Sequence, residues 1–182
     1  MNTIKGFNVP DSWNDVTIKQ LLELQKIEGA DTKSAMQMIQ VFNPDKDPTT
    51  LALFDMVDVA AKIYDFIIQT PQSEKVDSYS IDGIRYKIAI PETIDFQQFI
   101  DVQALHSTSE LEQVKNLPLL ISVLTENRPK EAKEWAEVIG ENVSVSMAMG
   151  CVLFFSDCLQ TYIKDTLHYS MNSDQISEIN TK

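Results

Sequence analysis

A short sequence pattern occurs twice in this chain, 78 positions apart. Residues 16–27 (Val-Thr-Ile-Lys-Gln-Leu-Leu-Glu-Leu-Gln-Lys-Ile) align without a gap on residues 94–105. Each copy places a helix-capping residue, Thr17 or Asp95, before an apolar stripe that contains two glutamines. A Val-Pro or Ile-Pro step lies shortly upstream of each copy. We therefore predict an internal duplication, with chance recurrence of a common amphipathic helix start as the alternative.

The duplicated pattern contains no reactive side chain, which argues against an enzyme because catalytic residues usually converge on one site. His106 and His168 each lie apart from any Cys, His or paired carboxylate, so neither has the spacing of a metal ligand. Cys151 and Cys158 lie among apolar residues, where thiols are inert. We therefore expect a non-enzymatic protein with no catalytic residues, no cofactor and no metal site.

Charge and hydropathy exclude several classes of partner. The net charge is −12, and Lys and Arg form no cluster, so we expect no direct binding to nucleic acid or to an anionic membrane. The longest apolar stretch, residues 143–155, is too short to cross a bilayer, and the chain starts without a signal-peptide pattern. Cys151 and Cys158 lie about two helical turns apart, too far to form a disulfide. These features favour a reduced, cytoplasmic protein.

Hydrophobic periodicity predicts a mainly α-helical fold with a small β part, of the α+β class. Apart from the two repeated helix starts, helices are expected near residues 31–42, 49–69, 109–125, 129–139 and 142–169. Asp82-Gly83 between two alternating segments predicts a β-hairpin at residues 78–90. Residues 4–9 resemble a short edge strand, which could extend this hairpin to a three-stranded sheet.

The repeat suggests a division into two halves. We predict a first half at residues 1–75, a second half with the hairpin at 76–169, and a polar, flexible tail at 170–182. The repeated glutamines are expected to bond to backbone across the pseudo-twofold axis that relates the halves. Those glutamines are Gln20, Gln25, Gln98 and Gln103.

The segment 143–159 is apolar around almost its whole circumference. Such a helix is either buried in the core, the more frequent case, or half-buried with one face available to a partner. Under the second alternative its large apolar side chains are the partner-binding candidates. These are Met147, Met149, Val152, Phe154, Phe155 and Leu159.

Three segments resemble small morphogenesis proteins of tailed bacteriophages. They are residues 9–20 (Val-Pro-Asp-Ser-Trp-Asn-Asp-Val-Thr-Ile-Lys-Gln), residues 81–101, which lead from the hairpin through Ile90-Pro91 into the second repeat, and residues 116–124. The resemblance covers roughly residues 9–130, and the Asn-, Asp-, Ile- and Lys-rich style is similar to that of crAss-like phages. No catalytic residues carry over from this family.

The resemblance implies one of two roles. Many such proteins are tail assembly chaperones, which bind a tail or other virion protein in the host cytoplasm before it is incorporated. Others are structural virion components of the tail, or of the neck and head-tail connector, where homo-oligomeric rings are common. We expect a phage tail or other virion protein as the partner under either role.

Overall fold

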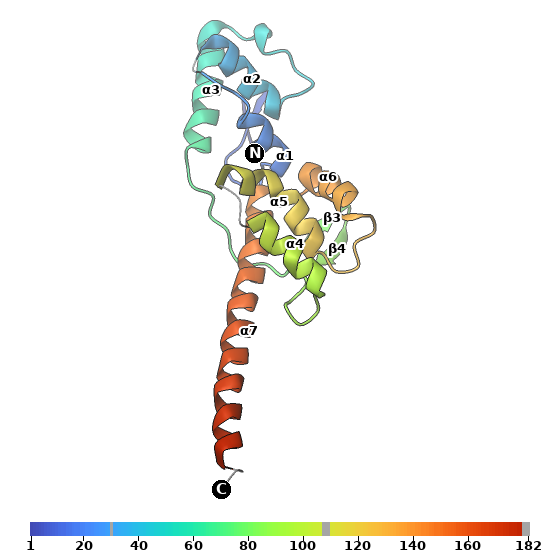
Figure 1. The fold of residues 1–182 in the computed structure, drawn as a ribbon. Coiled ribbons are helices and arrows are strands. Elements are labelled where there is room, and N and C mark those ends of the chain that lie inside the picture. Colours follow the sequence, from blue (N-terminus) through green and yellow to red (C-terminus); the bar gives the residue numbers. More distant parts are fainter. Residues whose placement is uncertain (30, 107–109, 180–182) are drawn as a thin grey trace.

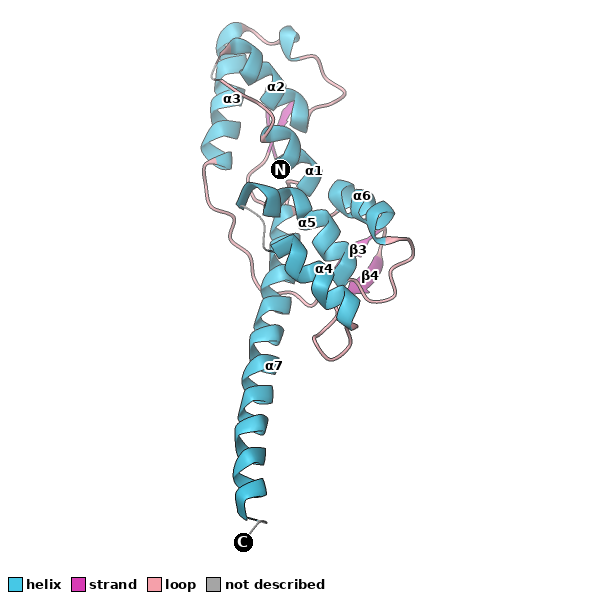
Figure 2. Cartoon of the chain, in the orientation of Figure 1, coloured by secondary structure: helices cyan, strands magenta, loops and turns pink. Residues whose placement is uncertain are grey.

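The computed structural model describes the backbone of residues 1–29, 31–106 and 110–179, and the side chains of all of these except 106, 110–111 and 167–179. Within this part of the chain, helices dominate and the strands are short (Figure 2). The fold is mainly α with a small β part, as the sequence predicts. In chain order the elements are β1 (Asn2–Ile4), β2 (Phe7–Val9), α1 (Ile18–Leu24), α2 (Thr32–Phe42), a 3-10 helix η1 (Pro48–Thr50), α3 (Leu53–Ile67), β3 (Ser78–Ile81), β4 (Ile84–Lys87), α4 (Phe96–His106), α5 (Glu110–Leu124), α6 (Ala132–Asn142) and α7 (Val145–Ile179).

The described residues contain two β-hairpins, not one hairpin with a third strand. β1 pairs with β2, and β3 pairs with β4, in two separate antiparallel sheets. The turn residues of both hairpins have positive φ: 52° and 82° at Lys5-Gly6, and 51° and 77° at Asp82-Gly83. This is the type I′ turn, which matches the twist of the flanking strands. The expectation of one strand at residues 4–9 is therefore wrong, because Lys5-Gly6 turns the chain back on itself.

The two repeated helix starts form the same capping box. At α1, the Gln20 N–H donates to Thr17 Oγ1 at 3.2 Å, and the Thr17 N–H donates to Gln20 Oε1 at 2.9 Å. At α4, the Gln98 N–H donates to Asp95 Oδ1 at 2.7 Å, and the Asp95 N–H donates to Gln98 Oε1 at 3.0 Å. Each box satisfies two backbone donors that a helix start otherwise leaves unpaired.

The first glutamine of each copy also bonds to the helix that follows. Gln20 Nε2 donates to the Val41 carbonyl, and Gln98 Nε2 donates to the Val123 carbonyl, both at 3.4 Å. Val41 and Val123 are the penultimate residues of α2 and α5. The two halves thus agree in hairpin, capping box and glutamine bond, which is the pattern that the predicted duplication would leave. Gln20 and Gln98 therefore bond to backbone within their own half and not across the predicted axis.

The buried apolar side chains form two core clusters. One joins β2, α1, α2 and α3, and the other joins β3, α4, α5, α6 and the start of α7. The clusters lie on either side of the predicted boundary at residues 75/76, with two exceptions. Ile18 of the first half belongs to the second core, and Val145 belongs to the first. The halves therefore exchange one fully buried side chain each.

A short antiparallel contact between residues 16–18 and 143–145 connects the halves. Thr17 forms an isolated β-bridge with Ser144. The Val145 N–H donates to the Val16 carbonyl at 2.8 Å, and the Ile18 N–H donates to the Val143 carbonyl at 3.2 Å. The four apolar residues of this contact are at most 2% exposed. The contact is thus a dry backbone link between the start of α1 and the start of α7.

Helix α7 packs on the body at its start and then projects away from it (Figure 1). Every residue from Gln160 to Thr166 is exposed, which covers nearly two helical turns. The sequence predicts that this helix ends near Tyr169, before a polar tail that begins at Ser170. The structure instead continues the helix to Ile179. No Pro or Gly occurs after Gly150, so no residue interrupts the helical backbone.

The segment between α3 and β3 lies against α7 at Gly150. The Val76 N–H donates to the Gly150 carbonyl at 3.2 Å, and Ser146 Oγ donates to the Gln72 carbonyl at 3.1 Å. A Cβ atom at Gly150 would lie 2.4 Å from the Glu74 carbonyl oxygen. Only glycine therefore allows this close approach of the two backbones.

Replacing Gly150 with alanine is expected to destabilise the protein by about 1–3 kcal/mol, because the new methyl group displaces the segment that holds β3 on α7. Urea unfolding measures the change. Gly140→Ala is the matched control, since Gly140 is also helical and its added Cβ would lie 3.8 Å from the nearest atom, in Pro118. We expect the control to be neutral or slightly stabilising. Equal effects of the two substitutions would contradict the close approach at Gly150.

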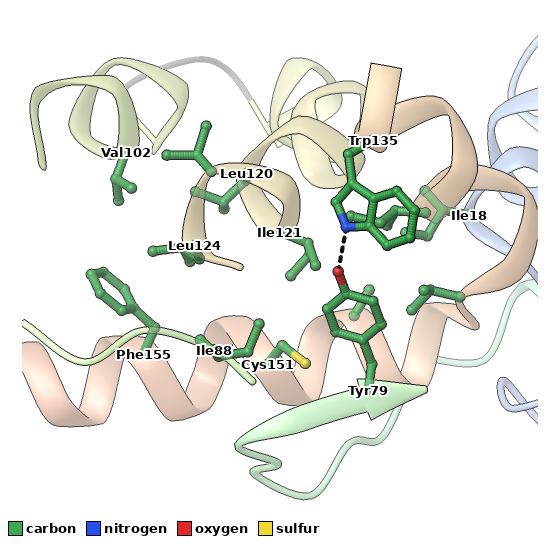
Figure 3. Packing of buried hydrophobic residues seen from close by; sticks show 14 of the residues in the cluster. Ile18, Tyr79, Ile88, Val102, Leu120, Ile121, Leu124, Trp135, Cys151 and Phe155 are labelled. Atoms are coloured by element: carbon green, nitrogen blue, oxygen red, sulfur yellow. Dashed lines mark hydrogen bonds between the residues drawn. The ribbon is translucent and has the colours of Figure 1, made fainter. Parts of the chain in front are cut away.

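A buried hydrogen-bond network fixes the second hairpin on its helices, and Figure 3 shows its bond between Trp135 and Tyr79. Trp135 Nε1–H donates to the Tyr79 hydroxyl oxygen at 2.8 Å, and Thr125 Oγ1–H donates to the Ile121 carbonyl at 2.7 Å. Tyr79 and Thr125 hydroxyl oxygens lie 2.8 Å apart. Because the Thr125 hydroxyl has one hydrogen, already donated to Ile121, Tyr79 must donate in this bond. The three hydrogen bonds therefore run in one direction: Trp135 donates to Tyr79, Tyr79 to Thr125, and Thr125 to the Ile121 carbonyl.

Tyr79→Phe removes the central member of the network and leaves the Trp135 N–H without its acceptor. We expect a loss of about 1–3 kcal/mol in the free energy of unfolding, the cost of leaving a buried polar group unsatisfied. Chemical denaturation is the measurement. Tyr86→Phe serves as the control, since Tyr86 is half-buried and its ring stacks on Tyr79 at 5.5 Å between centroids. If Tyr86→Phe lowers the free energy of unfolding as much as Tyr79→Phe does, the Tyr79 hydroxyl is not the central member of a stabilising network.

Candidate docking surface on α3

Of the partner-binding candidates predicted on α7, one lies in a core and the others pack against one. Phe155 is 2% exposed and belongs to the second core. The other five are half-buried: Met149 packs on the first core, and the rest pack on the second. The structure therefore favours the core alternative for this part of α7. The six residues, Met147, Met149, Val152, Phe154, Phe155 and Leu159, offer no shared exposed face to a partner.

The two cysteines are free thiols without the features of a nucleophile. Cys151 is fully buried, and burial raises the pKa of its thiol to about 12. Cys158 is half-buried, and its pKa is also raised, mainly by burial. Because the thiolate is the reactive form, both groups are kept in the unreactive state. The side chains of His106 and His168 lie outside the described residues.

The described residues also hold no cluster of three or more His, Cys, Asp or Glu side chains that could bind a metal ion. An open depression of about 890 Å³ lies between the start of α4 and the loop that precedes α6. Its charged residues, among them Arg128 and Lys130, are half-buried or exposed. The depression therefore lacks the desolvated titratable group typical of acid–base sites.

No helix in the described part of the chain combines the length and the apolar character needed to cross a bilayer.

Helix α3 has two apolar faces. Its inner face packs on α2 and β2, and Phe66 of this face lies against Trp13 with ring centroids 4.7 Å apart. This inner face accounts for the burial of α3 in the first core. Its buried residues are Met56, Val59, Ala60, Ile63 and Phe66.

The opposite face of α3 is apolar and exposed. Phe54 is 87% exposed, and Val57, Tyr64 and Ile68 are each more than half exposed, with exposed Ala61 between them. These five residues follow one another at intervals of three, four, three and four, so they form one stripe along the helix. We call this stripe the α3 outer face. Helix α3 lies at the edge of the molecule, away from the second half (Figure 1).

The α3 outer face is large for an isolated surface. It extends over about 21 Å of helix, given a rise of about 1.5 Å per residue. The exposed fractions of its side chains correspond to roughly 500 Å² of apolar surface, near the upper end of the largest patches found on monomers. Patches of this size commonly mark interaction sites.

The two flanks of the α3 outer face differ in charge. One flank carries Asp58 and Asp65, both exposed and seven residues apart, so they lie on the same side of the helix. Lys62 lies further round the helix and offsets one of these charges. The opposite flank contains Leu53, Ala60 and Ile67. The stripe thus has one apolar border and one border with net negative charge.

The second half of the chain provides an internal comparison for this surface. α6 follows α5 and packs on it, as α3 follows α2 and packs on it. The exposed residues of α6 are all polar or charged, whereas those of α3 include the apolar stripe. The fold therefore does not require an apolar outer face at this position of the repeat. The exposed α6 residues are Lys133, Glu134, Glu137, Glu141 and Asn142.

The sequence does not reveal this surface, because hydrophobic periodicity marks the apolar residues of α3 without showing which of them the rest of the chain covers. The sequence does contain a signal that α3 has a second apolar side. Phe54, Val57 and Tyr64 repeat at helical spacing on the side opposite Met56 and Ile63, so the helix is apolar on both sides. Without the fold, nothing shows which side is covered.

Comparison with known protein families, with curated proteins and with solved structures gave no match to this chain.

The raised pKa of Cys151 predicts a loss of stability at alkaline pH. The thiol ionises near its ordinary value of 9.0 in the unfolded chain but near 12 in the folded protein. Stability is therefore unaffected below pH 9 and falls by about 1.4 kcal/mol per pH unit between these values, because the unfolded state releases the proton first.

Urea unfolding of the wild type and of Cys151→Ala between pH 8 and 11 measures this effect. The wild type should lose stability more steeply than the variant above pH 9. Cys158→Ala is the matched control, and its thiol is half-buried, so its slope should stay closer to the wild type. Parallel curves for the wild type and Cys151→Ala would show that burial does not hold this thiol protonated.

Proposed function

We propose that this chain is a non-enzymatic binding protein of bacteriophage assembly, which holds a tail or other virion protein through the α3 outer face. One observation supports binding above all others. Five consecutive stripe positions, from Phe54 to Ile68, are apolar and exposed, although the matching helix of the second half has a charged outer face. Exposed apolar surface of this size lowers solubility, and a partner that covers it would stabilise both proteins.

The absence of an enzymatic role is part of this proposal. It is supported by the unreactive environments of Cys151 and Cys158 and by the lack of a desolvated acid–base group in the depression beside Arg128. No cofactor or metal enters the proposal. The excess of negative charge favours protein partners over nucleic acid.

The phage context rests on sequence resemblance. It is carried by the helix start at residues 9–20 and by the hairpin-to-helix segment at residues 81–101. In this context the protein acts in the host cytoplasm, where it shields an aggregation-prone component before that component enters the particle. This is the role of a tail assembly chaperone.

A structural virion component is the second candidate, and the projecting end of α7 favours it. Every residue of this helix from Gln160 to Thr166 is exposed. An isolated helical extension obtains little stability from its own backbone. Packing between subunits of a ring in the neck or tail would cover such an extension.

Quantitative mass spectrometry of purified virions and of infected-cell lysate tests the proposal. We expect the chain to be abundant in lysate and absent from virions, as for an assembly chaperone. A copy number in the particle that matches a symmetric ring would instead support the structural role. Absence of the chain from lysate throughout infection would contradict both.

A phage that carries Phe54→Ser and Tyr64→Ser tests the surface itself. Both side chains are more than half exposed, so the substitutions should leave the melting temperature of the purified protein nearly unchanged. We expect fewer complete particles, because the component to be held loses its binding surface. Glu134→Ser with Glu137→Ser on α6 is the matched control. Normal particle yield from the α3 variant would exclude the α3 outer face as the functional surface.

A further inference from the structure

We infer that the α3 outer face binds a single amphipathic helix that carries Lys or Arg beside its own apolar stripe. This inference rests on the proposed function and specifies the chemistry of the partner. Two observations carry it: the spacing of the exposed apolar residues and the charge of the flank that contains Asp58 and Asp65.

The spacing of the stripe fits a helix better than a strand or a flat surface. Intervals of three and four residues generate the ridge that packs into the grooves of another helix at a small crossing angle. Ala61 lies at the centre of the stripe, between Val57 and Tyr64. Its small side chain allows the two helix backbones to approach closely at this point, while the larger residues on either side fill the gaps between partner side chains.

The charge of the flank specifies the residues beside the partner's stripe. Asp58 and Asp65 are one heptad apart and both exposed, so two positive side chains one heptad apart on the partner would face them. Such pairs contribute modestly to affinity at a rim, but they fix register and orientation. The net charge of −12 on the whole chain further favours a basic partner in the first encounter.

The same flank disfavours a second copy of this chain in the antiparallel arrangement. A twofold axis at Ala61 would place Phe54 opposite Ile68 and Val57 opposite Tyr64, which suits their apolar side chains. It would also place Asp58 of each copy opposite Asp65 of the other. Two like-charged pairs across one short interface are destabilising. The occupant that relieves this negative charge is a different helix with basic flanks.

Two synthetic peptides of 21 residues test the inference. Both carry Leu and Ile at intervals of three and four, and they differ only in the residues that flank the stripe, which are Lys in one and Glu in the other. Fluorescence anisotropy at low salt measures their binding to the full chain. We expect the Lys peptide to bind roughly three- to tenfold more tightly. This preference should disappear in Asp58→Asn with Asp65→Asn, and it should shrink at high salt.

Glu134→Gln with Glu137→Gln is the charge-matched control, and it should retain the preference, since both residues lie on α6. Equal affinity of the two peptides would overturn the basic-partner inference and leave docking on α3 intact. If neither peptide binds, and Val57→Glu leaves the sedimentation coefficient of the chain unchanged, the α3 outer face is not a docking surface. A dimer that Val57→Glu dissociates and that the Lys peptide does not compete with would identify a second copy as the occupant, against the inference.

Discussion

The antiparallel contact between residues 16–18 and 143–145 is the interaction on which the rest of the fold depends. Thr17 and Ser144 face each other in this contact and each caps a helix, since Ser144 Oγ accepts from the Met147 N–H at 3.2 Å as Thr17 accepts from Gln20. The starts of α1 and α7 therefore fix each other. Because Ile18 and Val145 cross into opposite cores, neither core can be completed without this contact.

The sequence predicts those parts of the fold that local chemistry determines. The capping residues Thr17 and Asp95 and the turn Asp82-Gly83 each have a recognisable pattern, and each forms the expected structure. The first hairpin was not predicted, because three-residue strands are too short to show alternation and Lys5 is not a typical turn residue. The crossing of Ile18 into the second core is accompanied by its backbone bond to Val143, 125 residues away in the sequence, which no local pattern records.

The candidate site was beyond prediction for a different reason. Periodicity identifies apolar residues, but it does not show which of them the rest of the chain covers. On α7, the sequence leaves open whether Phe155 is core or partner-binding, and only packing shows that it is core. On α3, the residues that belong to the core, such as Ile63, and those that do not, such as Tyr64, alternate around one helix. Only the positions of α2 and β2 show which of these residues are covered and which are exposed.

Duplication makes the composition of the α3 outer face informative. The two halves share hairpin, capping box and glutamine bond, so they repeat the same local arrangement. The two helices differ on the side that faces away from their cores, which carries an apolar stripe on α3 and polar or charged residues on α6. Side chains such as Phe54, at 87% exposure, contribute almost nothing to the stability of the isolated chain, because burial is what stabilises apolar groups. The proposed binding of a partner helix accounts for their apolar character, which the stability of the isolated chain does not require.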